Sequence, residues 1–571
     1  MIAKMTQYSF ILLHGDKEKF LTGLQQLGVV DITRSAKPVD SYSQGILDNI
    51  ETVRRDIECT EMGMDDTLAE LLAERNTLLQ EIQDITPWGE YDRDRLAPFG
   101  IHYYSVAAKK FDPAWAEQYA LQVAHEQDGV VWFVIVGDNA GFPLKALPAP
   151  QHTPAELEPS LKELERKIEL HRKVLEGRKE SIPQMQHHIL SLETELDRYL
   201  ASTAAVPAAE NTIDTLVGFA PTENDKAVTD YLEREGVLYL KEEAKVEENP
   251  PIKFKNNKFV KMFEVLTDMY GRPAYDGFDP TPFIAVFFLL FFALCMGDAG
   301  YGLVLILAGL LLKKVDSFRD MAPLVTTLGI ATVIVGFFLH TFFSIDIAQW
   351  KCFEGIRWIF LPDEIAGYAG GMVLSLIVGV VHLCLAMVVK AVNAVRVNGF
   401  AASLGTLGWT LLIVGGVIVG GIALTGGMSA EITKWVVIAL GVISAIGIFP
   451  LNDIKRNKLA NVGLGFWDTY QMVTGLLGDV LSYLRLYALG LAGSMLGMAF
   501  NDMGKMVLGD GSNPIFWVFF ILLVLIGHTL NIAMCALGAF VHPLRLNFLE
   551  FFKNSGYEAN GRKFNPLVNN K

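Results

Sequence analysis

Hydrophobic residues are distributed very unevenly along this chain. Residues 1–275 mix charged and apolar positions, whereas residues 280–552 consist mainly of apolar runs broken by short polar loops. Since a bilayer core of about 30 Å needs about 20 helical residues to cross it, the second half predicts about eight membrane helices. The expected segments are 281–295, 298–312, 323–344, 368–390, 403–426, 433–450, 464–500 and 514–552.

Two details of the apolar half concern its architecture. The first two segments form one apolar run interrupted by GDAGYG at residues 297–302, which predicts a tight break between two short helices. A single long tilted helix is the alternative. The last two segments are each close to forty residues long, about 60 Å as helices, so they are expected to tilt strongly or to protrude.

Basic residues between the apolar segments predict the orientation, because short cytoplasmic loops carry an excess of Lys and Arg. With eight crossings, one side holds Lys313, Lys314, Arg319, Lys390, Arg396, Lys455, Arg456 and Lys458, and the other holds Lys351, Arg357, Lys434 and Lys505. The N-terminal residues do not follow the pattern of a secretory signal. We therefore expect the N-terminal half and the C-terminus to be cytoplasmic.

The first half carries a seven-residue apolar repeat in two places. One run includes Leu161, Ile168, Leu175, Ile182, Ile189 and Leu196, with Leu164, Met185, Leu192 and Tyr199 at a second position; the other includes Ile50, Ile57, Met64, Leu71, Leu78 and Ile85. This spacing predicts an antiparallel coiled-coil hairpin with arms 41–90 and 155–203. Pro183 should kink the second arm. Two separate amphipathic helices on a globular core are the alternative.

Strand-like runs flank the predicted hairpin. Residues 101–107 and 130–137 indicate a distal lobe at 91–150, and residues 7–15 and 214–240 indicate a second lobe built from 1–40 and 205–250. The predicted fold class is therefore α+β for residues 1–275, a dumbbell of two small α/β lobes joined by the hairpin. An all-α membrane domain follows at 276–571. The dumbbell has the shape of a strut and gives no sign of a catalytic pocket.

Composition and motifs exclude several functions. A net charge of −15 argues against a nucleic-acid binder. The five cysteines show no close pairing, so neither disulfides nor a zinc site is expected, and no metal or cofactor is predicted. The chain lacks the G-x-x-x-x-G-K-[ST] phosphate loop. We therefore expect no ATP chemistry on this chain.

Charged residues inside the last two apolar segments are the candidate functional groups. Arg485 follows Asp479 by six residues, and a charged side chain at the bilayer centre costs about 3 kcal/mol or more. The helical face of Arg485 also carries small residues, which would let another surface come close: Ala492, Gly493 and Gly497. The structural alternatives are an ion pair of Arg485 with Asp479 and static packing of the glycines.

The final segment adds His528, His542 and Arg545. Arg545 lies nearer the expected cytoplasmic end, so snorkelling of its long side chain to the interface is an alternative to a functional role.

Four stretches carry a family resemblance. These are GDVLSYLRLYALGLAGS (478–494), NNKFVKMFEVLTDMYGRPAYDGFDPTPF (256–283), MGDAGYG (296–302) and VHPLRLNFLEFFKNSGYEANGRKFNPL (541–567). Together they resemble the membrane stator subunit of rotary V/A-type ATPases, called subunit a in eukaryotes and subunit I in prokaryotes. With the dumbbell, the resemblance covers essentially the whole chain, and the pattern is similar to that of prokaryotic members.

The resemblance implies an ion-translocating stator in a prokaryotic cell (inner) membrane. A proteolipid rotor ring would turn against it in the lipid bilayer, and two half-channels would carry H⁺ or Na⁺, coupled to ATP hydrolysis or synthesis elsewhere in the complex. Arg485 would favour the ionised form of each passing ring carboxylate, because opposite charges stabilise one another. Arg545 would assist, and Asp479 would line the cytoplasmic half-channel. The dumbbell would bind peripheral stalks and, through them, the soluble ATPase sector.

Two departures from the eukaryotic pattern leave the outer half-channel unassigned. Eukaryotic members carry histidine where this chain has Gly493, and glutamate where it has Cys535. Candidates there, by location only, are His528, His340, His382, Glu354 and Asp363. Two other functions stay open. A secondary transporter predicts two related membrane halves, which the sequence does not show convincingly; a membrane-anchored coiled-coil adaptor would make the charges purely structural.

Overall fold

The computed structural model describes residues 1–35, 37–91, 93–127, 129–208, 210, 212–315, 318–365, 367–450, 458–509 and 514–569. Lys455 and Arg456 of the expected basic loop lie outside these residues. The chain forms two compact units. The first comprises Met1–Ile11, Val29–Ile32 and Val217–Pro566, and the second comprises Leu12–Gly28, Thr33–Leu216 and Leu567–Lys571. Each is described by itself.

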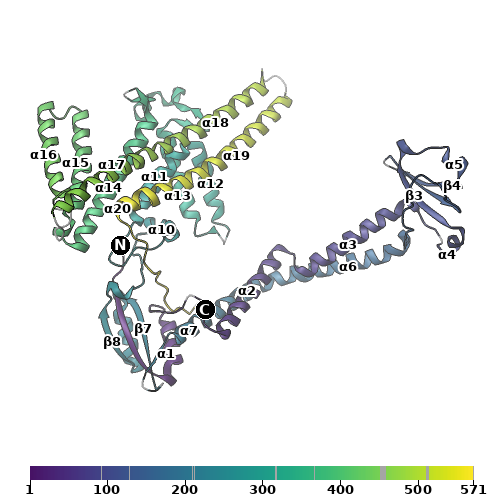
Figure 1. Cartoon of the computed structure of the whole chain (residues 1–571), viewed down its shortest axis with the longest axis horizontal. Helices are drawn as coiled ribbons and strands as arrows, with labels where there is room; N and C mark the ends of the chain where they lie inside the picture. Colours follow the sequence, from purple (N-terminus) through teal and green to yellow (C-terminus); the bar gives the residue numbers. More distant parts are fainter. Residues whose placement is uncertain are drawn as a thin grey trace. The chain divides into compact units, whose positions relative to one another are not determined.

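The second unit contains two pairs of long helices that lie side by side (Figure 1). Helix α2 (Ser41–Met62) contacts α7 (Ile182–Thr203), and α3 (Asp66–Ile85) contacts α6 (Pro154–Arg178). The α3–α6 contact buries Leu68, Leu164, Ile168 and Leu175. The last three belong to the predicted seven-residue repeat. The long helices therefore pair through those positions, while a supercoiled hairpin stays a prediction.

Each predicted arm of the hairpin consists of two helices, so the seven-residue repeat is interrupted at the junction between them. Helix α2 stops at Gly63, whose φ of 64° is left-handed, and the side chain of Asp65 caps α3. Met64 therefore lies in a turn and is 45% exposed, so its place in the apolar repeat was predicted wrongly. Pro183 lies in the first turn of α7, after a 3-10 turn at Lys179–Ser181. A proline is tolerated there because that N–H has no helical partner.

A small antiparallel sheet completes the second unit at residues 101–136. Its strands are β3 (Ile101–Ala107), β4 (Leu121–Gln127) and β5 (Val130–Val136), in the order β3-β5-β4. Alternate residues of β5 (Val131, Phe133 and Ile135) are buried with Tyr104, and aromatic rings of the adjoining segments pack over them. The short helices nearby are α4 (Arg93–Leu96) and α5 (Trp115–Gln118).

Strands from distant parts of the chain form a second sheet with the order β2-β7-β1-β8, and β6 pairs with β7. The strands are β1 (Met5–Leu13), β2 (Asp31–Ile32), β6 (Val206–Ala208), β7 (Ile213–Pro221) and β8 (Leu238–Glu243); the helices beside them in sequence are α1 (Lys17–Leu27) and α8 (Asp225–Glu235). Strands β1 and β8 are antiparallel, with Thr6 opposite Glu243 and Ile11 opposite Leu238.

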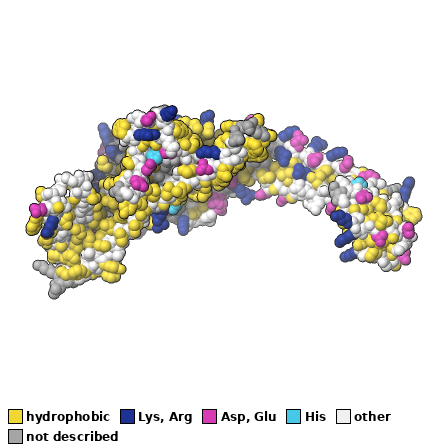
Figure 2. Space-filling model, turned by 90° about the horizontal axis from the view of Figure 1, so that it is seen from above, with side chains coloured by type: hydrophobic (Ala, Val, Ile, Leu, Met, Phe, Trp, Pro, Cys, Tyr) yellow, Lys and Arg dark blue, Asp and Glu magenta, His cyan; other side chains and the backbone are white. Residues whose placement is uncertain are grey.

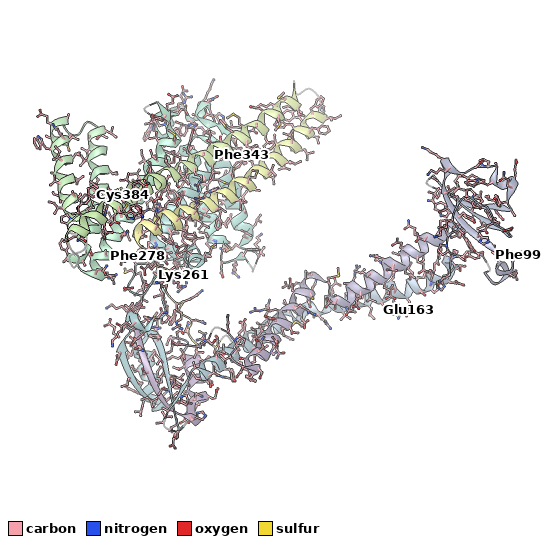
Figure 3. The ribbon with its side chains drawn as sticks, viewed as in Figure 1. Phe99, Glu163, Lys261, Phe278, Phe343 and Cys384 are labelled. Carbon is pink, nitrogen blue, oxygen red and sulfur yellow. The ribbon has the colours of Figure 1, made fainter. Side chains whose placement is uncertain are left out.

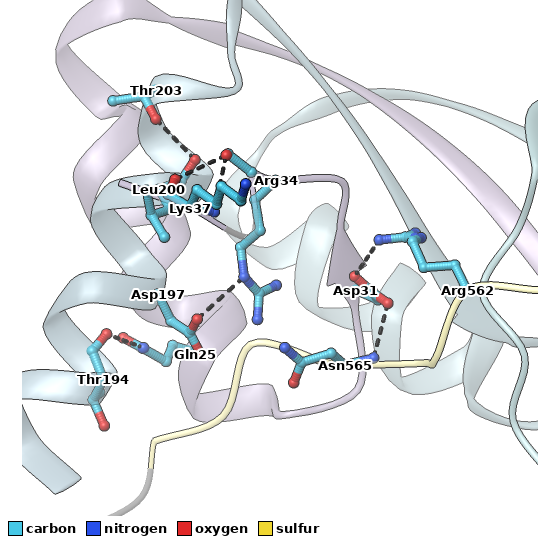
Figure 4. A network of polar contacts seen from close by, with 11 residues as sticks. Gln25, Asp31, Arg34, Lys37, Thr194, Asp197, Leu200, Thr203, Arg562 and Asn565 are labelled. Carbon is cyan, nitrogen blue, oxygen red and sulfur yellow. Dashed lines mark hydrogen bonds and ion pairs between the residues drawn. The ribbon is translucent and has the colours of Figure 1, made fainter. Parts of the chain in front are cut away.

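Figure 4 shows polar contacts that fix the ends of these segments. In the first unit, the buried Asp31 carboxylate accepts hydrogen bonds from Arg562 Nη1 at 3.3 Å and from the Asn565 amide at 2.9 Å. The C-terminal segment is thereby held beside β2. In the second unit, Arg34 pairs with Asp197 of α7 at 3.3 Å.

The rest of the first unit is a block of helices. Their bounds are α9 (Lys258–Lys261), α10 (Glu264–Tyr270), α11 (Thr281–Met296), α12 (Ala299–Leu312), α13 (Ala322–Phe338), α14 (Gly370–Asn398), α15 (Leu404–Leu424), α16 (Ala430–Ile448), α17 (Lys458–Ser482), α18 (Leu484–Leu508), α19 (Pro514–Arg545) and α20 (Phe552–Ser555), with a π-helical turn at Leu546–Phe551. Among the described residues, five helical spans are long and apolar enough to cross a membrane, and α11, α12 and α13 are shorter apolar helices. Hydrophobic side chains cover much of the visible face of this block (Figure 2).

The sequence GDAGYG forms the predicted break. Gly297 ends α11 with a left-handed φ of 59°, and Asp298 caps the start of α12. Two short helices are therefore confirmed, and the single long helix is not formed. A one-residue irregularity, which the apolar pattern does not signal, falls at Tyr483 between α17 and α18, and the backbone of Tyr483 stays in the right-handed helical region. Arg485 follows directly and lies close to the middle of the apolar helical span Asn461–Leu508.

Asp65 holds the first turn of α3 in the second unit. Its carboxylate accepts hydrogen bonds from the Leu68 amide at 2.8 Å and from His171 Nε2 at 2.9 Å. Burial alone would raise the pKa of Asp65, but these hydrogen bonds outweigh burial and hold the pKa of the carboxyl below its ordinary value. The ionised form is therefore the one that stabilises the helix.

Replacing Asp65 by Ala should make the first turn of α3 open more easily by about 1 kcal/mol, because it removes the N-cap. Hydrogen exchange of peptides covering 62–75, measured on the full chain, should then speed up about fivefold. A carboxyl with a lowered folded-state pKa stabilises above its unfolded value of about 3.9 and loses this effect as the pH falls through the folded value. The difference from wild type should accordingly be complete at neutral pH and vanish in strong acid.

Asp66→Ala is the matched control, since Asp66 is 89% exposed and pairs with Arg55 on the surface. It should change exchange far less. Equal exchange in the Asp65 and Asp66 variants would show that Asp65 does not hold the turn.

Candidate functional site

Helices α18 and α19 pack antiparallel and run side by side (Figure 1). Glycines of α18 mark their register: Gly504 faces Val524, Gly497 faces Asn531, and Gly493 faces Cys535. Each step back along α18 matches an equal step forward along α19. Continuing the register places Arg485 level with residue 543, between His542 and Arg545 on the neighbouring helix.

The electrostatics agree with this register, because both arginines act on the His542 imidazole. Arg485 also acts on the Cys295 thiol, at the end of α11. Nη1 of Arg485 and Nδ1 of His542 are buried and have no hydrogen-bond partner within the described ranges. Arg545 is exposed. The helix pair therefore brings three of the predicted residues together and leaves a buried cationic nitrogen without an anionic partner among the described residues.

Asp479 pairs with residues other than Arg485. Its carboxylate accepts a hydrogen bond from Asn554 Nδ2 at 2.7 Å and pairs with Lys553 Nζ at 3.3 Å. The structure thus gives no support to an ion pair between Asp479 and Arg485. Asp479 instead ties the end of α17 to the segment that follows the π-helical turn.

Two of the small residues expected to face a partner are buried within the chain. A methyl group added at Gly493 would lie 2.5 Å from Cys535 Sγ, and one added at Gly497 would overlap the Ser344 side chain. Both glycines therefore serve close packing inside this unit, and the idea that they face a rotor is corrected. Of the three, Ala492 is exposed.

His528 belongs to a hydrogen-bonded network that links α12, α18 and α19. The Tyr301 hydroxyl accepts from Asn531 Nδ2 at 2.8 Å and donates to His528 Nδ1 at 2.8 Å. His528 Nε2 then donates to Asn501 Oδ1 at 3.0 Å. Both ring nitrogens are occupied and the residue is 8% exposed. These hydrogen bonds fix the orientation of the His528 ring.

Asp298 anchors this network to the loop that follows α13. Its carboxylate, 2% exposed, accepts from the amides of Gly300 at 2.8 Å, Tyr301 at 3.2 Å, Phe343 at 2.8 Å and Ser344 at 2.6 Å. Phe343 and Ser344 have left-handed φ values of 46° and 58°, which ordinary residues rarely adopt. Phe343 (labelled in Figure 3) places its ring against Tyr301, with centroids 5.8 Å apart.

The remaining outer-side candidates fall into two places. His340 lies between Asp346 at 3.0 Å and Asp363 at 3.3 Å, beside a cavity of about 240 Å³ that also reaches Tyr487 of α18. His382 is fully buried, its Nδ1 shares a hydrogen bond with the Tyr483 hydroxyl at 2.9 Å, and its ring stacks on Phe551. Glu354 lies in a 3-10 helix, Lys351–Ile359.

Sequence reasoning missed the uncharged polar residues of this region. Only charged residues and histidines were considered as candidates in the apolar segments, so Asn501, Asn531 and Tyr301 were overlooked. A signal was present, because Asn531 follows His528 by three residues and shares its helical face. Glu550, which follows Arg545 in the same stretch of sequence, was also overlooked.

Comparison with known proteins agrees with this arrangement. The profile of the V-type ATPase 116kDa subunit family matches residues 144–322 and 468–568, which include the glycine–aspartate break and both arginines. "V-type ATP synthase subunit I 1" of Treponema pallidum is 26% identical over 99% of this chain and 100% of its own length. The chain belongs to this family.

Archaeal members are more similar over a shorter region. "A-type ATP synthase subunit I" of Methanocaldococcus jannaschii is 35% identical over 57% of this chain, and that of Pyrococcus abyssi is 31% identical over 62%. The chain spans only about half the length of these two relatives, 50% and 53%. With its apolar helical spans, this family member is a membrane protein.

Asp298→Asn should loosen the outer loop, because a single amide oxygen cannot accept all four N–H groups and the new NH₂ faces donors. We expect a loss of about 3 kcal/mol in the local free energy of opening. Hydrogen exchange of residues 340–346 in the detergent-purified chain measures it. Asp346→Asn, in the same loop but 40% exposed, should have a much smaller effect. Equal protection in wild type and Asp298→Asn would contradict the anchoring role.

Gly493→Ala should destabilise the α18–α19 pair by about 2 kcal/mol and lower the Tm by about 5 °C, because the new methyl group overlaps Cys535. Cys535→Gly in the same chain should restore most of the loss by removing the obstructing sulfur. A thermal shift measured on the purified chain compares the single and double variants. If Cys535→Gly fails to rescue, the glycine does not pack as described.

Proposed function

We propose that this chain is the ion-translocating stator subunit of a rotary V/A-type ATPase. The observation that carries the proposal is the buried Nη1 of Arg485, which has no anionic partner in the described part of the chain. An unpaired cation inside an apolar helical block is costly, so a function normally accompanies it. A carboxylate on a separate subunit would supply the missing charge.

In the proposed mechanism, carboxylates of a proteolipid rotor ring pass Arg485 one after another. The guanidinium favours the ionised form of each carboxylate, so the bound H⁺ or Na⁺ must leave before the carboxylate passes. Arginine suits the role because it keeps its own proton and its planar fork meets carboxylates. Release into one half-channel and uptake from the other would then couple ion flow to rotation.

The other site residues take distinct parts in this proposal. Arg545 lies near the same level and is exposed, so it would meet the carboxylate beside Arg485. His542, near both arginines, would line the contact. We assign positioning roles to Asp479 and His528, because the first is paired with Lys553 and the second is fully hydrogen-bonded. Ala492 is the small residue left to face the ring.

The remaining partners follow from the same proposal. The second unit, with its long paired helices, would bind peripheral stalks and connect this chain to a soluble ATPase sector that carries the ATP chemistry. The protein would lie in the lipid bilayer of a prokaryotic cell (inner) membrane with its N-terminal half and C-terminus in the cytoplasm. The basic loops near Lys313 and Lys390 favour that orientation.

Arg485→Gln should abolish ATP-driven ion uptake into inverted membrane vesicles, at least about a hundredfold, because the neutral amide no longer drives ions off the passing carboxylate. Complex assembly should be unchanged, and ATP should still be hydrolysed once the soluble sector is detached. Arg396→Gln is the matched control, an exposed arginine near the end of α14 that lies outside the proposed site.

Normal uptake with Arg485→Gln would make the arginine structural and overturn the proposal. Co-purification gives an independent check, because only a stator should bring down a proteolipid ring together with ATPase subunits. A secondary transporter or an adaptor would not.

A further inference from the structure

A cavity of about 370 Å³ lies beside the C-terminal part of α14, and none of the residues of the proposed ion path lines it. Its walls come from four parts of the first unit: residues 273–278 before α11, the last turns of α14, the start of α15, and residues 555–558 at and after the end of α20. The volume is that of a small-molecule site. The lining is polar enough to recognise a charged ligand.

Two side chains of opposite charge line this cavity without pairing. Lys390 of α14 and Asp276 of the loop before α11 are both half-buried. Neither has an ion-pair or hydrogen-bond partner in the described part of the chain, and the two do not pair with each other. A charge partly withdrawn from water without a partner is unfavourable. A ligand that brings the opposite charge to each would remove both costs.

The end of α20 holds the Lys390 side chain at the cavity. Gly556 ends α20 with a left-handed φ of 67°, and a side chain there would begin 3.6 Å from Lys390 Cγ and 3.8 Å from Cε. The lysine stem therefore packs along the glycine. Snorkelling towards water would by itself account for a lysine near the end of a membrane helix. It does not account for the carboxylate of Asp276, which lines the same cavity and stays apart from the ammonium.

The two charges select a zwitterionic ligand. A simple anion would meet Lys390 but would be repelled by Asp276 and by Glu558, an exposed carboxylate that also lines the cavity. A simple cation would be repelled by Lys390. A phosphate and a primary ammonium on one short ligand satisfy both ends, because lysine binds phosphate as a point charge and an ammonium donates its N–H groups to a carboxylate. The side chain of Asn393 lies on the same wall as Lys390 and adds an amide donor.

The place of the cavity along α14 favours a lipid as the source of this zwitterion. With 29 residues, α14 is about 43 Å long and exceeds a hydrocarbon core of about 30 Å, so its end reaches the headgroup layer. Apolar side chains are exposed there, Val397 on the cavity wall at 46% and Phe400 beyond the helix at 66%. Acyl chains would cover such side chains, and a small soluble zwitterion would leave them in water.

We propose that this cavity binds the headgroup of a phosphatidylethanolamine lipid, with the phosphate at Lys390 and the ammonium at Asp276. The inference goes beyond the stator function and does not depend on it. The bound headgroup would join the loop before α11 to α14 through its two charged ends. Phe278 of that loop (labelled in Figure 3) and Tyr557 after α20, with ring centroids 5.8 Å apart, form part of the wall around it.

Native mass spectrometry of the full chain, purified in detergent, tests the proposal. The chain is titrated with phosphatidylethanolamine, phosphatidylcholine and phosphatidylglycerol that carry the same acyl chains. Phosphatidylethanolamine should form a one-to-one complex about tenfold more tightly than the other two, the loss expected for one charge-assisted hydrogen bond. Choline has no N–H to donate to Asp276, and glycerol has no positive charge.

Two variants assign the two ends of the headgroup. Lys390→Gln should weaken binding of all three lipids about tenfold, because each carries the phosphate, and should keep the preference for ethanolamine. Asp276→Asn should instead remove the preference for ethanolamine over choline. Arg396→Gln is the matched control, an exposed basic residue of the same helix that does not line the cavity, and it should change neither affinity nor preference.

The unaltered chain already decides the proposal, whether or not a variant folds. Equal affinity for the three lipids would overturn it, and so would an ethanolamine preference that persists in a folded Asp276→Asn chain. Soluble glycerophosphoethanolamine separates two sources of the same chemistry. It should compete far more weakly than the lipid, because it lacks the acyl chains that cover Val397 and Phe400. Equal potency of the soluble compound would overturn the assignment to a lipid.

Discussion

The carboxylate of Asp298 is the contact on which the geometry of the site depends. It gathers four amides from two chain segments more than forty residues apart and stabilises the left-handed backbone at Phe343 and Ser344. It also caps α12 and so holds Tyr301, whose hydroxyl joins His528 and Asn531 of α19. Asn531 in turn donates to the Gly493 carbonyl of α18 at 2.8 Å. The α18–α19 register, and with it the level of Arg485, is therefore tied to one buried acid.

Much of the fold could be predicted from the sequence, because apolar run length and seven-residue spacing are local properties. The eight apolar segments and the break at Gly297 follow from these patterns, as do the buried heptad positions Leu164, Ile168 and Leu175. Met64 was misplaced because a glycine turn takes it out of the repeat. Helical periodicity placed Gly493 and Gly497 on the same face as Arg485, but it could not tell which neighbour covers that face. Only the packing of α19 and the Ser344 loop decides this.

The site shows why charge alone is a poor guide inside an apolar block. Asp479 and Arg485 look like a pair in sequence, yet each has different surroundings, because Lys553 and Asn554 hold the Asp479 carboxylate while Arg485 lies near His542 of α19. The departures from the eukaryotic pattern also become intelligible. Gly493 and Cys535 stand where those members carry histidine and glutamate, and here the two positions touch. The small pair lets the two helices pack closely, and uncharged Asn531 and Tyr301 supply polar links beside it.

The shortness of three helices has a consequence for the surrounding lipid. Helices α11, α12 and α13 contain 16, 14 and 17 residues, or roughly 21–26 Å, against a hydrocarbon core of about 30 Å. Several of their side chains face outward, including Leu307, Leu310 and Ile334. Lipid next to them must compress or let its headgroups dip to avoid exposing polar helix ends. The membrane would then be thinner around these three helices than around the longer helices α14 and α19.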